Sequence, residues 1–129
     1  MTLRERDRRI IEAPNFASVA TLLPDGSPHV STIWIDLDGG DVLFNTAEGW
    51  VKTNNLRRDT RVAISVFDLS DPYEQVVIRG TIVEMTHEQA DEHIDFLAKK
   101  YVGADTYPWR DPAEQRVTVR VRVDHVSNG

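Results

Sequence analysis

The chain has 129 residues, a formal net charge of −6 and no cysteine. That length fits a single domain over residues 1–129, and the absence of cysteine excludes disulfides and thiolate metal sites. The acidic balance argues against a nucleic-acid partner, because broad binding to phosphates needs a basic face.

The start of the chain and its hydropathy give no sign of a secretory or membrane segment. Residues 1–10 read MTLRERDRRI and lack the apolar centre of a signal peptide. No apolar run approaches the length that spans a bilayer. We therefore expect a cytoplasmic protein with no membrane partner.

The first part of the chain predicts a helix followed by three antiparallel strands. A charged segment with an apolar edge predicts a helix over residues 3–12, and Pro14 ends it. The turn sequences PDG at 24–26 and DGG at 38–40 predict reversals of the chain. The strands are expected at residues 15–23, 28–37 and 41–47.

The middle of the chain predicts a short helix and two strands. The helix is expected over residues 49–58, with Val51 and Leu56 turned inward. The strands are expected at 61–67 and 74–85, on either side of a loop at 68–72. Gly80 indicates a bend or a bulge in the second of them.

The last part predicts a helix, a loop and one further strand. Apolar residues at helical spacing predict a helix over residues 86–101, with Thr86 as its N-cap and Gln89 completing a capping box. After a loop at 102–112, residues 115–126 alternate between valine and polar residues, which indicates a strand. The valines that share one face are Val117, Val119, Val121 and Val123.

Six strands with few helices predict a mainly β (α+β) fold. We expect an antiparallel sheet covered by a few helices, and closure into a barrel would remove the exposed edges of the sheet.

The usual sequence motifs of catalysis and metal binding are missing. No two of the four histidines have the i, i+4 spacing of a zinc site. There is no G-x-S-x-G motif and no glycine pattern of the Walker or Rossmann type. We therefore predict no catalytic side chain and no metal ligand.

A basic cluster stands out in this acidic chain, within GWVKTNNLRRDTRV at residues 49–62. The start of a helix offers free N–H groups and a partial positive charge. Lys52 in the first turn and Asn55 one turn later therefore predict a site for a phosphate group. The alternative is a solvated basic face whose cations pair with Asp59 or Glu48. The other cations of the cluster are Arg57, Arg58 and Arg61.

Polar residues also gather on two strands of the predicted hairpins. They are Ser31, Thr32, Asn45 and Thr46. Such residues could present donors beside an aromatic ring, where main-chain groups read the polar edge of a flat heterocycle. The alternative is the ordinary polarity of a solvated sheet face, with Trp34 and Trp50 packed in a core or an interface.

Three segments together resemble the pyridoxamine 5′-phosphate oxidase-like superfamily. They read ASVATLLPDGSPHVSTIWI, VLFNTAEGWVKTNNLRRDTRVAISV and VVIRGTIVE. The most specific parts are K-x-x-N-L-R-R-D from Lys52 to Asp59 and P-D-G-x-P from Pro24 to Pro28. Within the superfamily, the chain resembles the branch that uses the deazaflavin coenzyme F420. The resemblance implies a six-stranded split β-barrel of the FMN-binding type that forms a homodimer, with the cofactor at the subunit interface.

The resemblance also implies roles for individual residues. Lys52 and Asn55 would hold the cofactor phosphate, assisted by Arg57 or Arg58. The ring and ribityl chain would lie along Ser31, Thr32 and Ile33, and the same wall would be completed by Asn45, Thr46 and Trp50. The substrate side would be lined by Trp109 and Tyr73.

Two departures from the pattern bear on the choice of cofactor. His29 and Val51 stand where the flavin-using oxidases of the superfamily usually carry basic residues. Fewer cations weaken the case for flavin mononucleotide (FMN) and for oxidation of pyridoxamine phosphate. The arginines at 57, 58 and 61 could instead meet the polyglutamate tail of F420.

The function implied by this resemblance is an F420-dependent oxidoreductase. It would transfer a hydride from the reduced deazaflavin to an electron-poor C=C or C=N bond of a quinone-like compound, an enone or a tetrapyrrole. One alternative is an FMN-dependent oxidoreductase of the same fold. Another is a carrier that binds a cofactor or a hydrophobic metabolite without turnover.

Overall fold

A computed structural model describes residues 2–129 of the chain. The helices are α1 (Glu5–Glu12), α2 (Val51–Arg58) and α3 (Ala90–Val102). The strands are β1 (Ala17–Leu22), β2 (Pro28–Ile33), β3 (Ile35–Asp38), β4 (Asp41–Ala47), β5 (Arg61–Asp68), β6 (Asp71–Thr86) and β7 (Arg116–Ser127). None of the helices in residues 2–129 has both the length and the apolar character needed to cross a bilayer.

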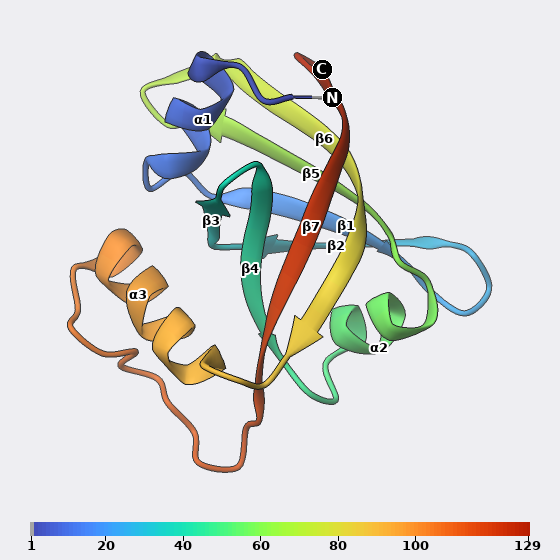
Figure 1. The fold of residues 1–129 in the computed structure, drawn as a ribbon, viewed down its shortest axis with the longest axis vertical. Helices are drawn as coiled ribbons and strands as arrows, with labels where there is room; N and C mark the ends of the chain where they lie inside the picture. Colours follow the sequence, from blue (N-terminus) through green and yellow to red (C-terminus); the bar gives the residue numbers. More distant parts are fainter. Residues whose placement is uncertain (1) are drawn as a thin grey trace.

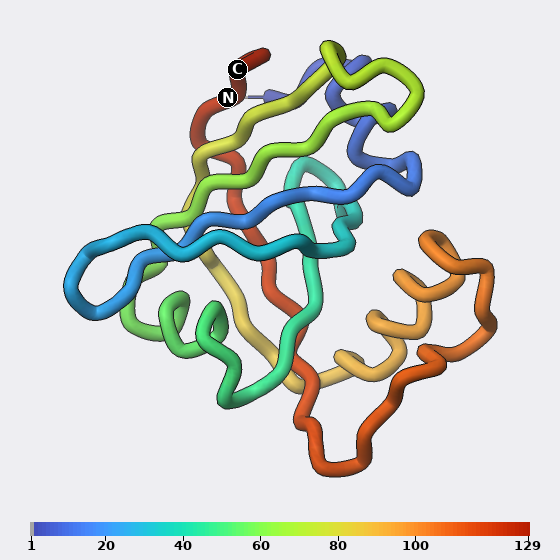
Figure 2. Tube along the Cα trace, turned by 180° about the vertical axis from the view of Figure 1, so that it is seen from behind, coloured from blue at the N-terminus to red at the C-terminus, as the bar shows by residue number. Residues whose placement is uncertain are grey.

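The seven strands of residues 2–129 form one curled antiparallel sheet in the order β2-β1-β5-β6-β7-β4-β3. Figures 1 and 2 show how strongly the sheet bends on itself. Its two edge strands are β2 and β3, yet only Trp34 separates them in the chain. The fold is therefore a mainly β half-barrel whose two edges are joined at Trp34.

The prediction of six strands is wrong because the strand expected at 28–37 is divided in two. The backbone of Ile35, just after the division, is bonded to side chains of α3. Its N–H donates to Tyr101 Oη at 3.0 Å, and its carbonyl oxygen accepts from Lys100 Nζ at 2.6 Å. Side chains from a distant helix thus replace part of the sheet bonding at this point, and the local sequence does not reveal it.

The barrel interior is filled by the side chains that alternate along the central strands. The four valines of β7 named above are all buried, which confirms the predicted face. β6 starts earlier than expected and forms a tight hairpin with β5 where a loop was predicted at 68–72. The bulge predicted at Gly80 is confirmed by a register shift there. A Cβ atom on Gly80 would lie 2.5 Å from the carbonyl oxygen of Arg122, so only glycine fits without movement.

The three helices cover different parts of the sheet (Figure 1). α1 packs on β3, β5 and β6, α2 packs on β1 and β4, and α3 packs on β4 and β7. In α2, Leu56 is buried as predicted, whereas Val51 is 47% exposed, contrary to the prediction.

The predicted capping box of α3 is also wrong. β6 extends through Thr86, so the helix begins only at Ala90, and its N-cap is Gln89 in a left-handed conformation. Thr86 Oγ1 instead accepts a hydrogen bond from the N–H of Glu88 at 3.0 Å.

Candidate functional site

A cavity of about 230 Å³ lies between α3 and the strands β2 and β4. The start of α2 and the segment between α3 and β7 complete its walls. It brings together Thr32, Ile33, Asn45, Trp50, Lys52 and Trp109 from the predicted site. Residues from four distant parts of the sequence therefore meet in one place.

Two cations lie near the ring of Trp50, which is the N-cap residue of α2. Lys52 Nζ is 5.6 Å from the ring centroid, and Arg116 Cζ is 5.1 Å from it. Burial, and then repulsion by Arg116, lowers the pKa of the Lys52 ammonium below its usual range. No carboxylate within residues 2–129 pairs with Lys52. An anion beside Lys52 would relieve its repulsion by Arg116, because Lys52 has no carboxylate partner of its own.

Arg116, at the start of β7, is a site residue that the sequence reasoning missed. It is 8% exposed, its Nε donates to Asn45 Oδ1 at 2.8 Å, and its Nη1 donates to Glu114 Oε2 at 2.9 Å. Its guanidinium also lies 5.4 Å from the ring centre of Tyr107. The Nη2 atom has no protein partner in residues 2–129, so Arg116 keeps donors free for a ligand.

An aromatic series lines the side of the cavity opposite α2. Trp34 stacks on Tyr101 at 5.3 Å with 6° between the rings, and it meets Tyr107 edge-on at 6.2 Å. Tyr107 in turn meets Trp109 edge-on at 5.7 Å. Asp95 of α3 holds this segment in place by accepting the backbone N–H of Tyr107 at 2.8 Å. The wall is therefore aromatic, as suits a flat conjugated ring.

Residues 3–128 match the sequence profile of the family described as pyridoxamine 5′-phosphate oxidase. The chain belongs to this family. The superfamily predicted from the sequence is therefore confirmed, and its fold is one that includes oxidoreductases.

Solved structures of the family fold resemble the chain over almost its full length. A solved F420 reductase is 27% identical, with a TM-score of 0.86 that covers 98% of this chain and 100% of the other. A conserved hypothetical protein from Mycobacterium tuberculosis is 22% identical, with a TM-score of 0.72 over 98% of this chain and 84% of its own. HupZ from Group A Streptococcus is 16% identical, with a TM-score of 0.71 over 97% of this chain and 92% of its own. The last two share the fold alone.

Within this family member, two of the predicted cofactor ligands are used to anchor α2. Asn55 is 2% exposed; its Nδ2 donates to Thr21 Oγ1 at 3.0 Å, and its Oδ1 accepts from Arg58. Thr46 is fully buried, and its hydroxyl is bonded to that of Thr53 at 2.9 Å. Their direct contact with a cofactor stays a prediction, and the structure gives both a role in holding the helix that carries Lys52.

The arginines of the basic cluster lie away from the cavity and already have partners. Arg57 binds both oxygens of Glu48, at 2.8 and 2.9 Å, and Arg61 binds Asp59 at 2.7 Å. Arg58 donates to the carbonyl oxygen of Leu22 at 2.7 Å. Arg57 and Arg61 therefore fit the alternative of a solvated basic face whose cations pair with Glu48 or Asp59. Lys52 does not fit it.

Two other predicted residues lie outside the cavity. Ser31 pairs in register with Val19 of the core, and its Oγ is buried without a partner in residues 2–129. Tyr73 is 94% exposed near the β5–β6 hairpin, on the part of the sheet that α1 covers. The substrate-side role proposed for Tyr73 would therefore need another part of the molecule or a second subunit.

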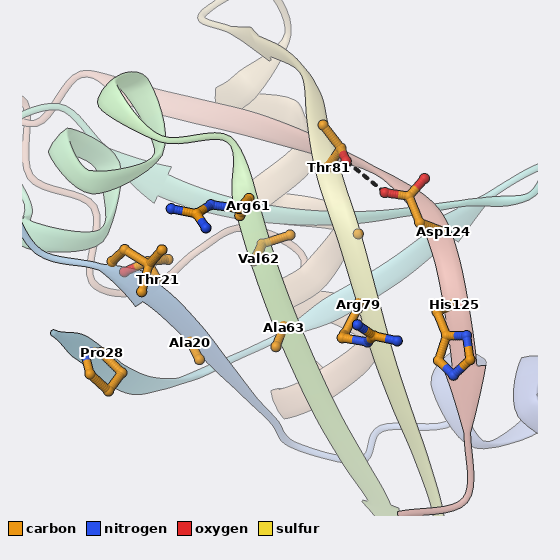
Figure 3. A pocket seen from close by; sticks show the side chains of 12 residues that line it. Ala20, Thr21, Pro28, Arg61, Val62, Ala63, Arg79, Thr81, Asp124 and His125 are labelled. Atoms are coloured by element: carbon orange, nitrogen blue, oxygen red, sulfur yellow. Dashed lines mark hydrogen bonds between the residues drawn. The ribbon is translucent and has the colours of Figure 1, made fainter. Parts of the chain in front are cut away.

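A shallow groove of about 600 Å³ crosses the outer face of the sheet over β1, β5, β6 and β7. Figure 3 shows the small side chains Ala20 and Ala63 in its centre, with Arg79 and His125 on neighbouring strands beyond them. The same face continues onto β2, where Val30 lies opposite Ala20 and is 63% exposed. Its β1–β2 part carries the apolar residues Ala20, Pro28 and Val30.

Proposed function

We propose that the protein is an F420-dependent reductase acting on an electron-poor C=C or C=N bond of a small organic substrate, such as a quinone-like compound, an enone or a tetrapyrrole. The likeness to a solved F420 reductase over 98% of the chain supports this proposal. The observation that carries it is the pair Lys52 and Arg116 beside Trp50, two cations with free donors and no carboxylate on Lys52.

The residues present fit an acidic cofactor with a flat ring. Lys52 and Arg116 would bind an acidic group through charge-assisted hydrogen bonds. The series Trp34, Tyr107 and Trp109 would support the ring and exclude water from its face. When bound, the deazaflavin supplies the hydride, and the protein's part is to position the acceptor bond against it. Because the cofactor supplies the hydride, the reaction requires no nucleophilic side chain.

We further propose that two copies of the chain form the complete site. A cavity of about 230 Å³ is smaller than the usual volume for cofactor-sized ligands, which is roughly 300–1,000 Å³. Thr32 lines this cavity and lies on the same face of β2 as Val30, so the cavity borders the apolar outer face. A second copy placed on that face would enlarge the site and cover Val30.

The dimer is tested by replacing a small residue at the centre of this face. Ala63→Arg places a charge on the outer face, and we expect the variant to sediment as a monomer while the parent protein sediments as a dimer. A parent protein that is monomeric at all concentrations would refute this part of the proposal.

The cofactor assignment is tested by titrating the purified protein with F420 and, separately, with FMN. We expect binding of F420, followed by oxidation of its reduced form in the presence of an acceptor from the proposed classes. Tight binding of FMN without binding of F420 would overturn the assignment. Binding of F420 without its oxidation across a broad panel of acceptors would indicate a carrier.

A further inference from the structure

A line of largely buried polar side chains leads from β3 and α3 to Asn45 and Arg116, which line the cavity. His93 of α3 has a side chain that is 11% exposed, and its Nε2 lies 3.4 Å from Oδ2 of Asp36 on β3, which is within ion-pair distance but without hydrogen-bond geometry. The other ring nitrogen, Nδ1, lies 3.2 Å from Nδ2 of Asn45 on β4. Asn45 Oδ1 accepts the hydrogen bond from Arg116 Nε. Four elements of the fold are connected by this line.

The orientation of the Asn45 amide follows from the donor on its far side. The Nε of an arginine can only donate, so the atom of Asn45 that faces it must be the oxygen. The amide nitrogen then donates both of its protons, to the carbonyl oxygen of Ala90 at 2.9 Å and to His93 Nδ1. His93 Nδ1 must therefore be an acceptor without a proton. The neutral ring carries its proton on Nε2, which points to Asp36.

We propose that His93 and Asp36 are positioning residues that fix the Asn45 amide and, through it, the guanidinium of Arg116. Asp36 favours a proton on Nε2, which leaves Nδ1 free to accept from Asn45. Asn45 can then direct only its oxygen toward Arg116. This hydrogen bond holds the guanidinium near Trp50 and leaves Nη2 of Arg116 free for a ligand. The structural part of this proposal is independent of the ligand, and the consequence for binding rests on the proposed function.

The arrangement makes the site sensitive to protonation of His93. The charged groups around this ring are Asp36 on β3 and, behind Asn45, Arg116 on β7; Lys100 of α3 is close enough to interact electrostatically with Asp36. A proton on Nδ1 would meet the amide protons of Asn45, so the amide would have to turn and present its nitrogen to Arg116 Nε. A proton on Nδ1 should therefore release Arg116. If His93 acted only through its charge, its protonation would strengthen ligand binding, because an added positive charge would favour an anion.

The first experiment needs no ligand. In an ¹⁵N-labelled protein, the neutral His93 ring should carry its proton on Nε2, and the Nε–H signal of Arg116 should move when His93 is replaced by leucine. A proton on Nδ1 of the neutral ring, or an Arg116 signal that the loss of the His93 acceptor leaves in place, would overturn the proposal.

Two substitutions of His93 give a matched comparison. His93→Asn keeps an acceptor near the Nδ1 position but cannot be protonated, whereas His93→Leu removes the acceptor. We expect His93→Asn to bind F420 as the parent does, because the asparagine oxygen can still accept from Asn45. His93→Leu should bind roughly fivefold to tenfold more weakly, as expected for one lost hydrogen bond.

These experiments can refute the positioning role of His93 and the proposed function separately. If the parent protein does not bind F420, the proposed function fails, and the spectra of the free protein still decide whether His93 positions Arg116. If F420 binds and both variants bind it equally well, the positioning role is refuted and the cofactor assignment stands.

Discussion

Cations at the two ends of α2 differ in what neutralises them. At the start of the helix, Lys52 has no carboxylate partner in residues 2–129, and both Lys52 and Arg116 lie near the ring of Trp50. At its end, Arg57 is held by both oxygens of Glu48, and just beyond it Arg61 is held by Asp59. Only the first end has an attraction for anions that the protein itself does not satisfy. The attraction of a cation in a basic cluster for a ligand anion therefore depends less on its position than on whether a carboxylate already binds it.

The largest effect that would sharpen this comparison is on ligand binding. Lys52→Met should weaken F420 binding by about 1–3 kcal/mol, as expected for loss of a charge-assisted contact. Arg57→Met removes the same charge from the same helix and should change the binding free energy by less than about 0.5 kcal/mol. Calorimetric titration of both variants measures the difference, and equal losses would show that only net charge matters.

A second effect separates anchoring of α2 from contact with the ligand. Asn55→Ala leaves the hydroxyl of Thr21 without its amide partner in a buried setting, so it should lower the free energy of unfolding by about 1–3 kcal/mol. Lys52→Met should leave that free energy unchanged or raise it, because it removes a partly buried and repelled charge. Urea denaturation of the two variants checks both signs. A destabilised Lys52→Met protein would show that Lys52 has a structural role.

A third effect concerns Lys100, a buried cation that binds carbonyl oxygens rather than carboxylates. Its Nζ donates to Ile11 O at 2.7 Å and to Ile35 O at 2.6 Å, and burial lowers the pKa of Lys100 to about 8 from an ordinary value of 10.5. The unfolded chain then binds more protons than the native one above about pH 8, so this group makes the free energy of unfolding rise with pH. The contribution of Lys100 can be measured without interference only up to about pH 10. Burial raises the pKa of Tyr101 to about 12, so above about pH 10 this tyrosine makes the free energy of unfolding fall with pH.

Denaturation between about pH 8 and pH 10 measures this slope. Lys100→Met should lose the rising contribution, whereas Lys99→Met should keep it, because Lys99 is 64% exposed and pairs with Asp105. A parent protein whose stability has the same pH dependence as the Lys100→Met variant would contradict the lowered pKa of Lys100.

The smallest effect is expected for the exposed pair at the end of the cluster. Arg61 has a side chain that is 76% exposed, so Arg61→Met should change the free energy of unfolding by no more than about 0.5 kcal/mol. Its effect on F420 affinity should be similarly small. A loss of affinity close to that of Lys52→Met would instead favour contact between Arg61 and an acidic tail of the ligand.

The sequence predicts well the features that depend on local patterns. The bounds of β4 agree with the predicted 41–47, and the alternating valines of β7 are all buried as expected, because both depend on hydrophobic periodicity and turn residues. The start of α2 near Lys52 is likewise predicted within two residues.

Features created by distant contacts could not be predicted. Alternation continues through Trp34, so nothing local indicates that Lys100 and Tyr101 divide the strand there. Arg116 looks like any polar residue of an alternating strand until Asn45 and Trp50 are placed beside it. Asn55 matches the pattern of a phosphate ligand, and only the packing of α2 on β1 shows that its amide is bonded to Thr21.

The most direct test is to measure the pKa of Lys52 by NMR of its labelled side chain, with and without F420. The account predicts a pKa below the ordinary value in the free protein, because burial and Arg116 disfavour the charge. It predicts a rise in that pKa when F420 is bound, because an acidic group then lies beside the ammonium. A Lys52 pKa that stays the same at saturating F420 would contradict the claim that this cation binds the cofactor.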